Sequence, residues 1–148
     1  KEEINLENLL NAYSEEVKES LLKCNFASDL NQLKKRFLDL RWSIVSGGDQ
    51  DELRYIFKKR KLNDFFDGGI YGSPDDKETI LKREFKNKNF LLPAIFIGDS
   101  KYDYDTAKNC GIDFIFLNKW TEFKNWEVFT KEKNISVINN LSELEKIL

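Results

Sequence analysis

Hydrophobic residues follow a helical period over the first part of the chain. Between residues 6 and 22, apolar side chains recur every three or four positions with Glu and Lys between them, which predicts a long amphipathic helix. The same spacing resumes after Ser28 and Asp29, either of which can cap a second helix. The side chains that this second helix is predicted to turn inward are Leu30, Leu33, Phe37 and Leu38.

From Trp42 onward, short apolar runs typical of buried strands alternate with segments of helical spacing. The predicted strands are Trp42–Val45, Phe65–Gly72, Ala94–Ile97, Phe114–Leu117 and Ser136–Ile138. The predicted helices are Asp49–Lys61, a segment from about Asp75 to Phe85, Asp103–Asn109 and Leu141–Leu148, with an aromatic loop over Trp120–Phe129. The first strand is expected to stop at the glycine turn Ser46-Gly47-Gly48. This alternation predicts an α/β fold, a Rossmann-like parallel sheet with helices on both faces.

Length and composition fit a single folded domain. The chain has 148 residues, of which 41% are hydrophobic, enough to build a core and too many for a disordered segment. Its net charge of −2 is too balanced to attract nucleic acid or an anionic membrane. The longest apolar stretch, eight residues broken by Pro93, is too short to cross a bilayer. We therefore expect neither a nucleic-acid nor a membrane partner.

The content of cysteine, histidine and methionine narrows the chemistry and the compartment. Two distant cysteines, Cys24 and Cys110, and no histidine exclude a disulfide framework, a zinc site and Ser-His or Cys-His nucleophiles. Carboxylates, Lys, hydroxyls and any bound metal are left to do chemistry. Such cysteine usage is typical of the reducing cytoplasm, and the lack of any Met indicates part of a longer gene product.

Residues that suit a phosphate follow three of the predicted strands. Ser46 and Gly47 follow the first, Lys77 follows the second, and Asp99 and Asp103 follow the third. Ligands of parallel sheets bind beyond the carboxyl ends of the strands, where loops and helix N-termini converge. A hydroxyl and backbone N–H groups can bind phosphoryl oxygens, a Lys can offset their charge, and two carboxylates can hold a hard cation. Each residue alone fits an ordinary turn, cap or surface role, but the combination predicts a phosphate and metal site.

Three segments resemble motifs of the haloacid dehalogenase superfamily of phosphatases and phosphotransferases. They are Ile44-Val45-Ser46-Gly47 for the second motif, Gly72-Ser73-Pro74-Asp75-Asp76-Lys77 for the third and Gly98-Asp99-Ser100-Lys101-Tyr102-Asp103 for the fourth. The resemblance runs from about Leu30 to Leu117, and the earlier helices are similar to the tail of a helical cap. It implies that residues 1–27 are part of that cap and residues 28–148 form the α/β core.

The resemblance implies a Mg2+-dependent phosphohydrolase that acts on a small phosphorylated metabolite through an aspartyl-phosphate. Ser46 and Gly47 would bind phosphoryl oxygens, and Lys77 would stabilise negative charge on the phosphoryl group and the attacking carboxylate. Asp99 and Asp103 would anchor Mg2+, directly or through water. The implied catalytic set is Ser46, Lys77, Asp99 and Asp103.

The nucleophile of this superfamily is the first Asp of an Asp-x-Asp motif at the end of the first strand. No such motif follows an apolar strand before Ser46, and the pair Asp103 and Asp105 lies inside the fourth motif. The superfamily places that first strand at the centre of the sheet, between the strands at Ile44 and Ile95. We therefore expect the core to lack its first strand, the nucleophile to lie outside these residues, and this chain alone to be inactive.

Alternatives remain open. One is a phosphomutase with the same chemistry, and another is a catalytically inactive fold that serves as a binding or assembly domain. A response-regulator receiver is disfavoured because its acidic pair comes first in the chain, whereas here Asp99 and Asp103 come last. A dehalogenase of the same fold would need no metal, so the two carboxylates argue against it. Substrate identity and oligomeric state are not determined by the sequence.

Two further clusters receive structural interpretations. The basic run Lys58–Lys61 is interpreted as the solvated end of a helix, where cations favour the negative end of the dipole. The aromatic residues of the C-terminal part are interpreted as one side of a helix or loop packed on the core. They are Trp120, Phe123, Trp126 and Phe129.

Overall fold

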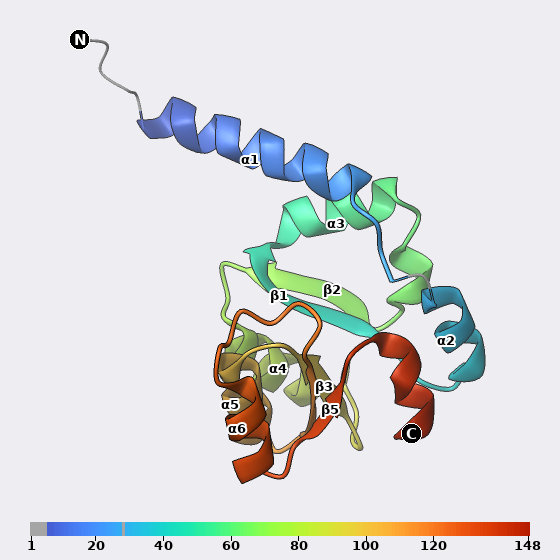
Figure 1. The fold of residues 1–148 in the computed structure, drawn as a ribbon. Helices are drawn as coiled ribbons and strands as arrows, with labels where there is room; N and C mark the ends of the chain where they lie inside the picture. The colour runs from blue at the N-terminus through green and yellow to red at the C-terminus, as the bar shows by residue number, and fades with distance from the viewer. Residues whose placement is uncertain (1–5, 28) are drawn as a thin grey trace.

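Helices and parallel strands alternate along the chain, as the spacing of apolar residues predicts. The structure, a computed structural model, describes residues 6–27 and 29–148 (Figure 1). The helices are α1 (Leu6–Lys23), α2 (Leu30–Arg36), α3 (Gln50–Lys59), α4 (Lys77–Lys86), α5 (Lys101–Asn109) and α6 (Trp126–Glu132), with 3-10 turns η1 (Asn63–Phe65) and η2 (Leu141–Lys146). The strands are β1 (Ser43–Asp49), β2 (Gly69–Ser73), β3 (Ile95–Gly98), β4 (Asp113–Leu117) and β5 (Ser136–Ile138).

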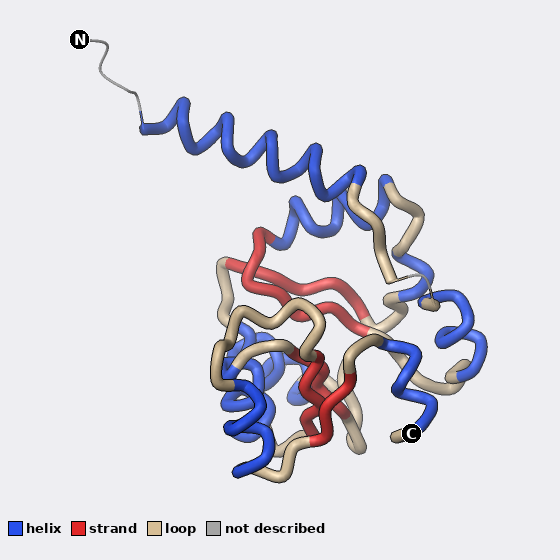
Figure 2. Tube along the Cα trace, in the orientation of Figure 1, coloured by secondary structure: helices blue, strands red, loops and turns tan. Residues whose placement is uncertain are grey.

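The strands form two parallel sheets, which Figure 2 shows in red. One sheet pairs β1 with β2, and the other has the order β3-β4-β5. Among the described residues, β1 and β3 each have one strand neighbour, so each keeps an unpaired edge. The prediction that the first strand stops at its glycines was wrong. β1 continues to Asp49, with an irregular register against β2 between Val45 and Asp49, because Gly tolerates such an irregularity.

Each of the three helices that follow β1, β2 and β3 begins with a side-chain cap. Asp49 accepts a hydrogen bond from the Glu52 N–H at 2.8 Å at the start of α3. Asp76 does the same for Thr79 at 2.7 Å in α4, and Ser100 caps α5. These residue types satisfy N–H groups that a helix start leaves unpaired. The caps therefore fix three helix N-termini directly after three strand ends.

The core below the three-stranded sheet is built by segments far apart in sequence. Figure 1 shows α2 beside the C-terminal turn η2, and the contacts between the two elements agree. Their buried side chains form one cluster with those of β4 and β5: Leu33, Ile115, Ile138 and Leu144. Phe37 packs against this cluster, as predicted, but the prediction for Leu38 was wrong, because α2 ends at Arg36 and leaves that side chain 73% exposed.

Aromatic packing covers the other part of the three-stranded sheet. Trp126 stacks on Phe116 of β4, and Phe129 contacts Phe123 with ring centroids 5.4 Å apart. Packing is therefore confirmed for three of the four aromatic residues, whereas the prediction was wrong for Trp120, which is 55% exposed. The expected aromatic loop also contains the helix α6 from residue 126 onward.

Helix α1 extends away from the rest of the chain (Figure 1). It touches the remainder mainly through α3, where the guanidinium of Arg60 donates to the carbonyl of Leu21 at 2.8 Å and to that of Cys24. Arg60 is thus bonded to the carboxyl end of α1, so the interpretation of the basic run as wholly solvated was wrong for this residue. Within the described part of the chain, no helix combines the length and apolar character that crossing a bilayer requires.

Candidate functional site

An ion pair joins the ends of the two sheets. Lys77 is the first residue of α4, after β2, and Asp103 lies in the first turn of α5, after β3. The Lys77 Nζ lies 2.6 Å from Asp103 Oδ1. The Asp103 side chain is 3% exposed and that of Lys77 is 20% exposed, so water screens this pair weakly. The structure therefore brings together two of the predicted site residues from separate strand ends.

Asp103 is held by three donors from the protein. Its Oδ1 accepts from Lys77, and its Oδ2 accepts from the hydroxyl of Ser100 at 2.8 Å and from the N–H of Asp99 at 3.3 Å. Both carboxylate oxygens are thus engaged within the described residues. Asp103 positions the Lys77 ammonium and the Asp99 turn, and a cation would reach it most directly through water.

Within the described residues, no side chain donates a hydrogen bond to the Asp99 carboxylate or forms an ion pair with it. Burial raises the pKa of its carboxyl, and the negative charges of Asp103 and Glu122 act in the same direction, against the nearby Lys77 ammonium. A cation beside Asp99 would oppose these effects and favour the charged form. The side chain is therefore suited to bind positive charge.

The donor set fits Mg2+. Mg2+ is usually held by one or two carboxylates, with waters and substrate oxygens completing its shell. Asp99, together with the neighbouring Asp103, matches that share. Over residues 6–27 and 29–148, the structure has no group of three or more His, Cys, Asp or Glu side chains that could hold a metal. The described residues therefore do not form a metal site made of protein ligands alone.

Ser46 and Gly47 lie at the end of β1. The Ser46 hydroxyl accepts a hydrogen bond from the Gly48 N–H at 3.1 Å, within the irregular stretch of β1 between Val45 and Asp49. Gly47 is exposed. None of the described hydrogen bonds or ion pairs links Ser46 to Lys77, Asp99 or Asp103. That Ser46 and Gly47 bind phosphate stays a prediction.

Gly98 leaves the space that the Asp103 side chain occupies. A Cβ at this position would lie 2.4 Å from Asp103 Cβ and 2.7 Å from its Oδ2. We expect Gly98→Ala to displace Asp103 and to lower the free energy of unfolding in urea by about 2 kcal/mol, as overpacking does. Gly47→Ala is the matched control, because a Cβ there meets nothing within 4 Å, and we expect a change below about 0.5 kcal/mol. Equal losses in the two variants would contradict this account.

Comparison with known proteins places this chain. A family profile described as haloacid dehalogenase-like hydrolase matches residues 1–117. The chain belongs to this family. It is similar in structure to a hydrolase from Streptococcus pneumoniae TIGR4, with a TM-score of 0.55 and 21% identity over 88% of this chain and 69% of that one. It is also similar to a HAD-superfamily hydrolase from Ehrlichia chaffeensis, with a TM-score of 0.59 and 21% identity over 95% of this chain and 70% of that one. No curated protein matches the chain.

The family predicted from the motifs and the α/β fold predicted from the alternation of strands and helices are therefore confirmed. In this haloacid dehalogenase-like chain, the third and fourth motifs carry the two residues that meet in the Lys77–Asp103 ion pair.

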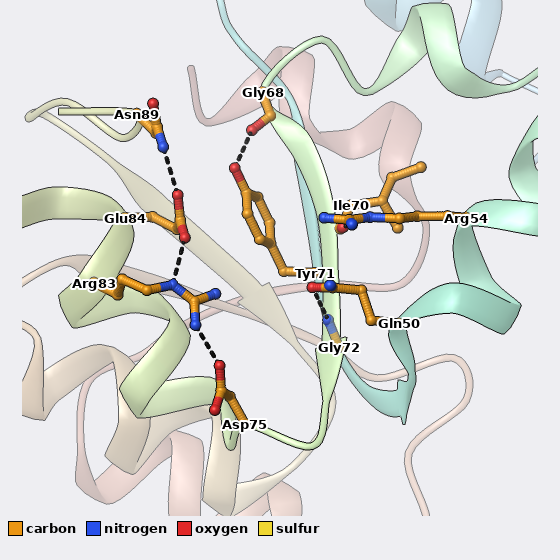
Figure 3. Close-up of polar contacts among 10 residues, drawn as sticks. All are labelled: Gln50, Arg54, Gly68, Ile70, Tyr71, Gly72, Asp75, Arg83, Glu84 and Asn89. Atoms are coloured by element: carbon orange, nitrogen blue, oxygen red, sulfur yellow. Dashed lines mark hydrogen bonds and ion pairs between the residues drawn. The ribbon is translucent and has the colours of Figure 1, made fainter. Parts of the chain in front are cut away.

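A polar network around the buried Glu84 supports the third motif and was missed in the sequence. Figure 3 shows Asp75, Arg83, Glu84 and Asn89 in a row along α4. Arg83 forms ion pairs with Asp75 and with Glu84, and Asn89 donates to Glu84 at 2.6 Å. Burial alone would raise the pKa of Glu84, but the hydrogen bonds from Asn89 and Arg83 outweigh it and leave that pKa below its usual value. The network ties the turn before Lys77 to the far end of α4.

The sequence does contain one sign of this network, which is a charged residue at a position on the apolar face of a helix. Glu84 lies seven residues after Lys77, which places it on the same face of α4 as the buried Ile80 and Leu81. A carboxylate on an apolar face indicates a buried partner, since an unpaired one would be costly.

An open hollow of about 560 Å³ lies outside this site, between α1 and the start of α3. Its lining residues are Ser14, Lys18, Asp49, Asp51, Glu52 and Tyr55. None of the predicted site residues lines it, although Asp49 belongs to the same strand as Ser46.

Proposed function

We propose that this haloacid dehalogenase-like chain is the core of a Mg2+-dependent phosphohydrolase that acts on a small phosphorylated metabolite in the cytoplasm. The observation that supports it is the Lys77–Asp103 ion pair at the joined strand ends, with the Asp99 carboxylate beside it. Ammonium and carboxylates at one point suit phosphoryl transfer, which depends mostly on positioning and charge neutralisation.

Each predicted residue has a role in this proposal. The Ser46 hydroxyl and the Gly47 N–H bind oxygens of the phosphoryl group. Lys77, held in direction by Asp103, neutralises charge on that group and on the attacking carboxylate. Asp99, with Asp103 through water, holds Mg2+, which when bound stabilises the charge of the transferring group.

The nucleophile in this proposal is an Asp that forms an aspartyl-phosphate and lies outside residues 1–148. We place it on a strand that pairs with the unpaired edges of β1, which carries Ser46, and β3, which ends just before Asp99. Backbone N–H and C=O groups along such edges gain hydrogen bonds when a further strand pairs with them. The same proposal assigns residues 1–27 to a cap and residues 28–148 to the core.

A phosphatase assay on two forms of the protein tests this function. Inorganic phosphate release is measured over a panel of sugar, nucleotide and organic-acid phosphates with Mg2+. We expect the 148-residue chain alone to be inactive and a form extended by its upstream sequence to be active. Chelation of Mg2+ and Asp99→Asn should each lower the extended form's rate by at least about a hundredfold, and Asp105→Asn should not. Turnover by the unextended chain that survives Asp99→Asn would overturn the proposal.

A second candidate is a catalytically inactive fold that binds or assembles with other molecules. The observation that favours it is that no Asp-x-Asp follows an apolar strand before Ser46 in this chain. An extended form that still lacks turnover on the whole panel would support it. A phosphomutase, the remaining alternative, would yield an isomeric phosphate ester and no inorganic phosphate.

A further inference from the structure

The loop after β4 reaches across to the turn that carries Asp99. The hydroxyl of Thr121 donates to the main-chain carbonyl of Asp99 at 2.5 Å. The same hydroxyl oxygen accepts from the N–H of Phe123 at 3.1 Å. One side chain therefore connects the loop after β4 to Asp99, 22 residues away in sequence, at the strand end of β3.

This loop is anchored on both sides of Thr121. On one side, the Thr121 N–H donates to the Asn118 carbonyl, and the Asn118 N–H donates to Ile138 of β5 at 2.9 Å. On the other side, Phe123 packs edge-to-face on Phe129 of α6. These contacts hold the backbone around Thr121 in place. Its hydroxyl can therefore restrict the position of Asp99.

Both main-chain polar groups of Asp99 are held by side chains. Its N–H donates to Asp103 Oδ2 at 3.3 Å, and its carbonyl accepts from Thr121. Two hydrogen bonds on opposite sides of one residue fix its backbone direction, and with it the direction of its Cα–Cβ bond. The preceding Gly98 is the last residue of β3 and pairs with Phe116 of β4, so the two bonds extend the order of the strand into the Asp99 turn.

We propose that Thr121 is a positioning residue that aims the Asp99 carboxylate at a divalent cation. This inference rests on the proposed function and adds to it a residue outside all three motifs. Thr121 does not touch the cation itself. Without the Thr121 hydroxyl, the Asp99 turn can rotate. Cation binding then has to order this turn again, which weakens the affinity.

The test is cation affinity in the 148-residue chain, with Mn2+ as the probe, followed by the electron paramagnetic resonance signal of the free ion and by Mg2+ competition. We expect Thr121→Val, which has nearly the same shape and no hydroxyl, to weaken Mn2+ binding about tenfold. Thr121→Ser keeps the donor and should stay within about twofold of the wild type. Thr121→Ala also lacks the hydroxyl. It is measured as well, because the test then still has a result if Thr121→Val does not fold.

Thr130→Val is the matched control. Thr130 is buried in α6, and its hydroxyl donates to the Glu127 carbonyl at 3.2 Å, so this substitution removes the same kind of hydrogen bond from another element. We expect its Mn2+ affinity to equal that of the wild type. Wild-type affinity in both Thr121→Val and Thr121→Ala, or an equal loss in Thr121→Ser or Thr130→Val, would overturn the role of Thr121 and leave the proposed function intact. Absence of Mn2+ and Mg2+ binding in the wild type would overturn both.

Discussion

Asp103→Asn is expected to lower the free energy of unfolding by about 2–3 kcal/mol, measured by urea denaturation. The Asn amide would bring an NH2 donor into a site where Lys77, Ser100 and the Asp99 N–H all donate, and it would leave the Lys77 charge without its partner. Breaking a buried ion pair from one side costs about 3–5 kcal/mol. The lower figure applies here because a fifth of the Lys77 side chain is exposed and can be hydrated.

The matched control for this prediction is Asp105→Asn on the same helix. Asp105 pairs with Lys101 at 2.7 Å, but both side chains are about half exposed. Such surface pairs contribute about 0–1 kcal/mol, so we expect a loss below about 0.5 kcal/mol. If the two variants lose the same stability, Asp103 is not the buried anchor that the structure indicates. Under the proposed function, Asp103→Asn in the form extended by its upstream sequence should also remove at least about 99% of the phosphatase rate measured with Mg2+, because Asp103 no longer holds the Lys77 ammonium in place.

Most elements could be predicted because one physical cause, burial of one face, sets their sequence period. The errors arise where another cause decides. β1 runs past Gly47 and Gly48 because Asp49 pairs with β2 again, at Ser73, after the irregular stretch. Leu38 has apolar character and helical spacing, but α2 ends before it, and a helix boundary depends on tertiary contacts that the spacing does not contain.

The candidate site was predictable only where it lies in local motifs. Lys77 and Asp103 follow strand ends, and parallel topology alone brings such positions to one edge. Ser100 was also accessible, since Ser followed three residues later by an acid is a capping signal. Thr121 was not, because its partner is a main-chain carbonyl on another loop, and any residue type presents that group. Long-range hydrogen bonds to the main chain leave no pattern in a single sequence.

Phe116→Ala is the second substitution with a large expected effect, and it tests the packing that holds the three-stranded sheet. Phe116 is fully buried on β4 and stacks on Trp126, with ring centroids 5.9 Å apart and planes 12° apart. Removing a buried Phe side chain costs about 3–5 kcal/mol, from lost transfer energy and from the cavity that remains. We expect that loss in urea denaturation, a large share of the roughly 5–15 kcal/mol that stabilises a domain.

Two companion variants separate burial from aromatic content. Phe116→Leu keeps most of the volume and should cost about 1–2 kcal/mol, because the stacked ring is lost and a smaller cavity forms. Trp120→Ala removes a larger ring from an exposed position on the loop after β4, and we expect a loss below about 1 kcal/mol. If Trp120→Ala lost more free energy of unfolding than Phe116→Ala, the exposed loop, and not the β4–α6 contact, would stabilise the three-stranded sheet. The predicted order instead follows from burial, since a side chain that water already surrounds has little transfer energy to lose.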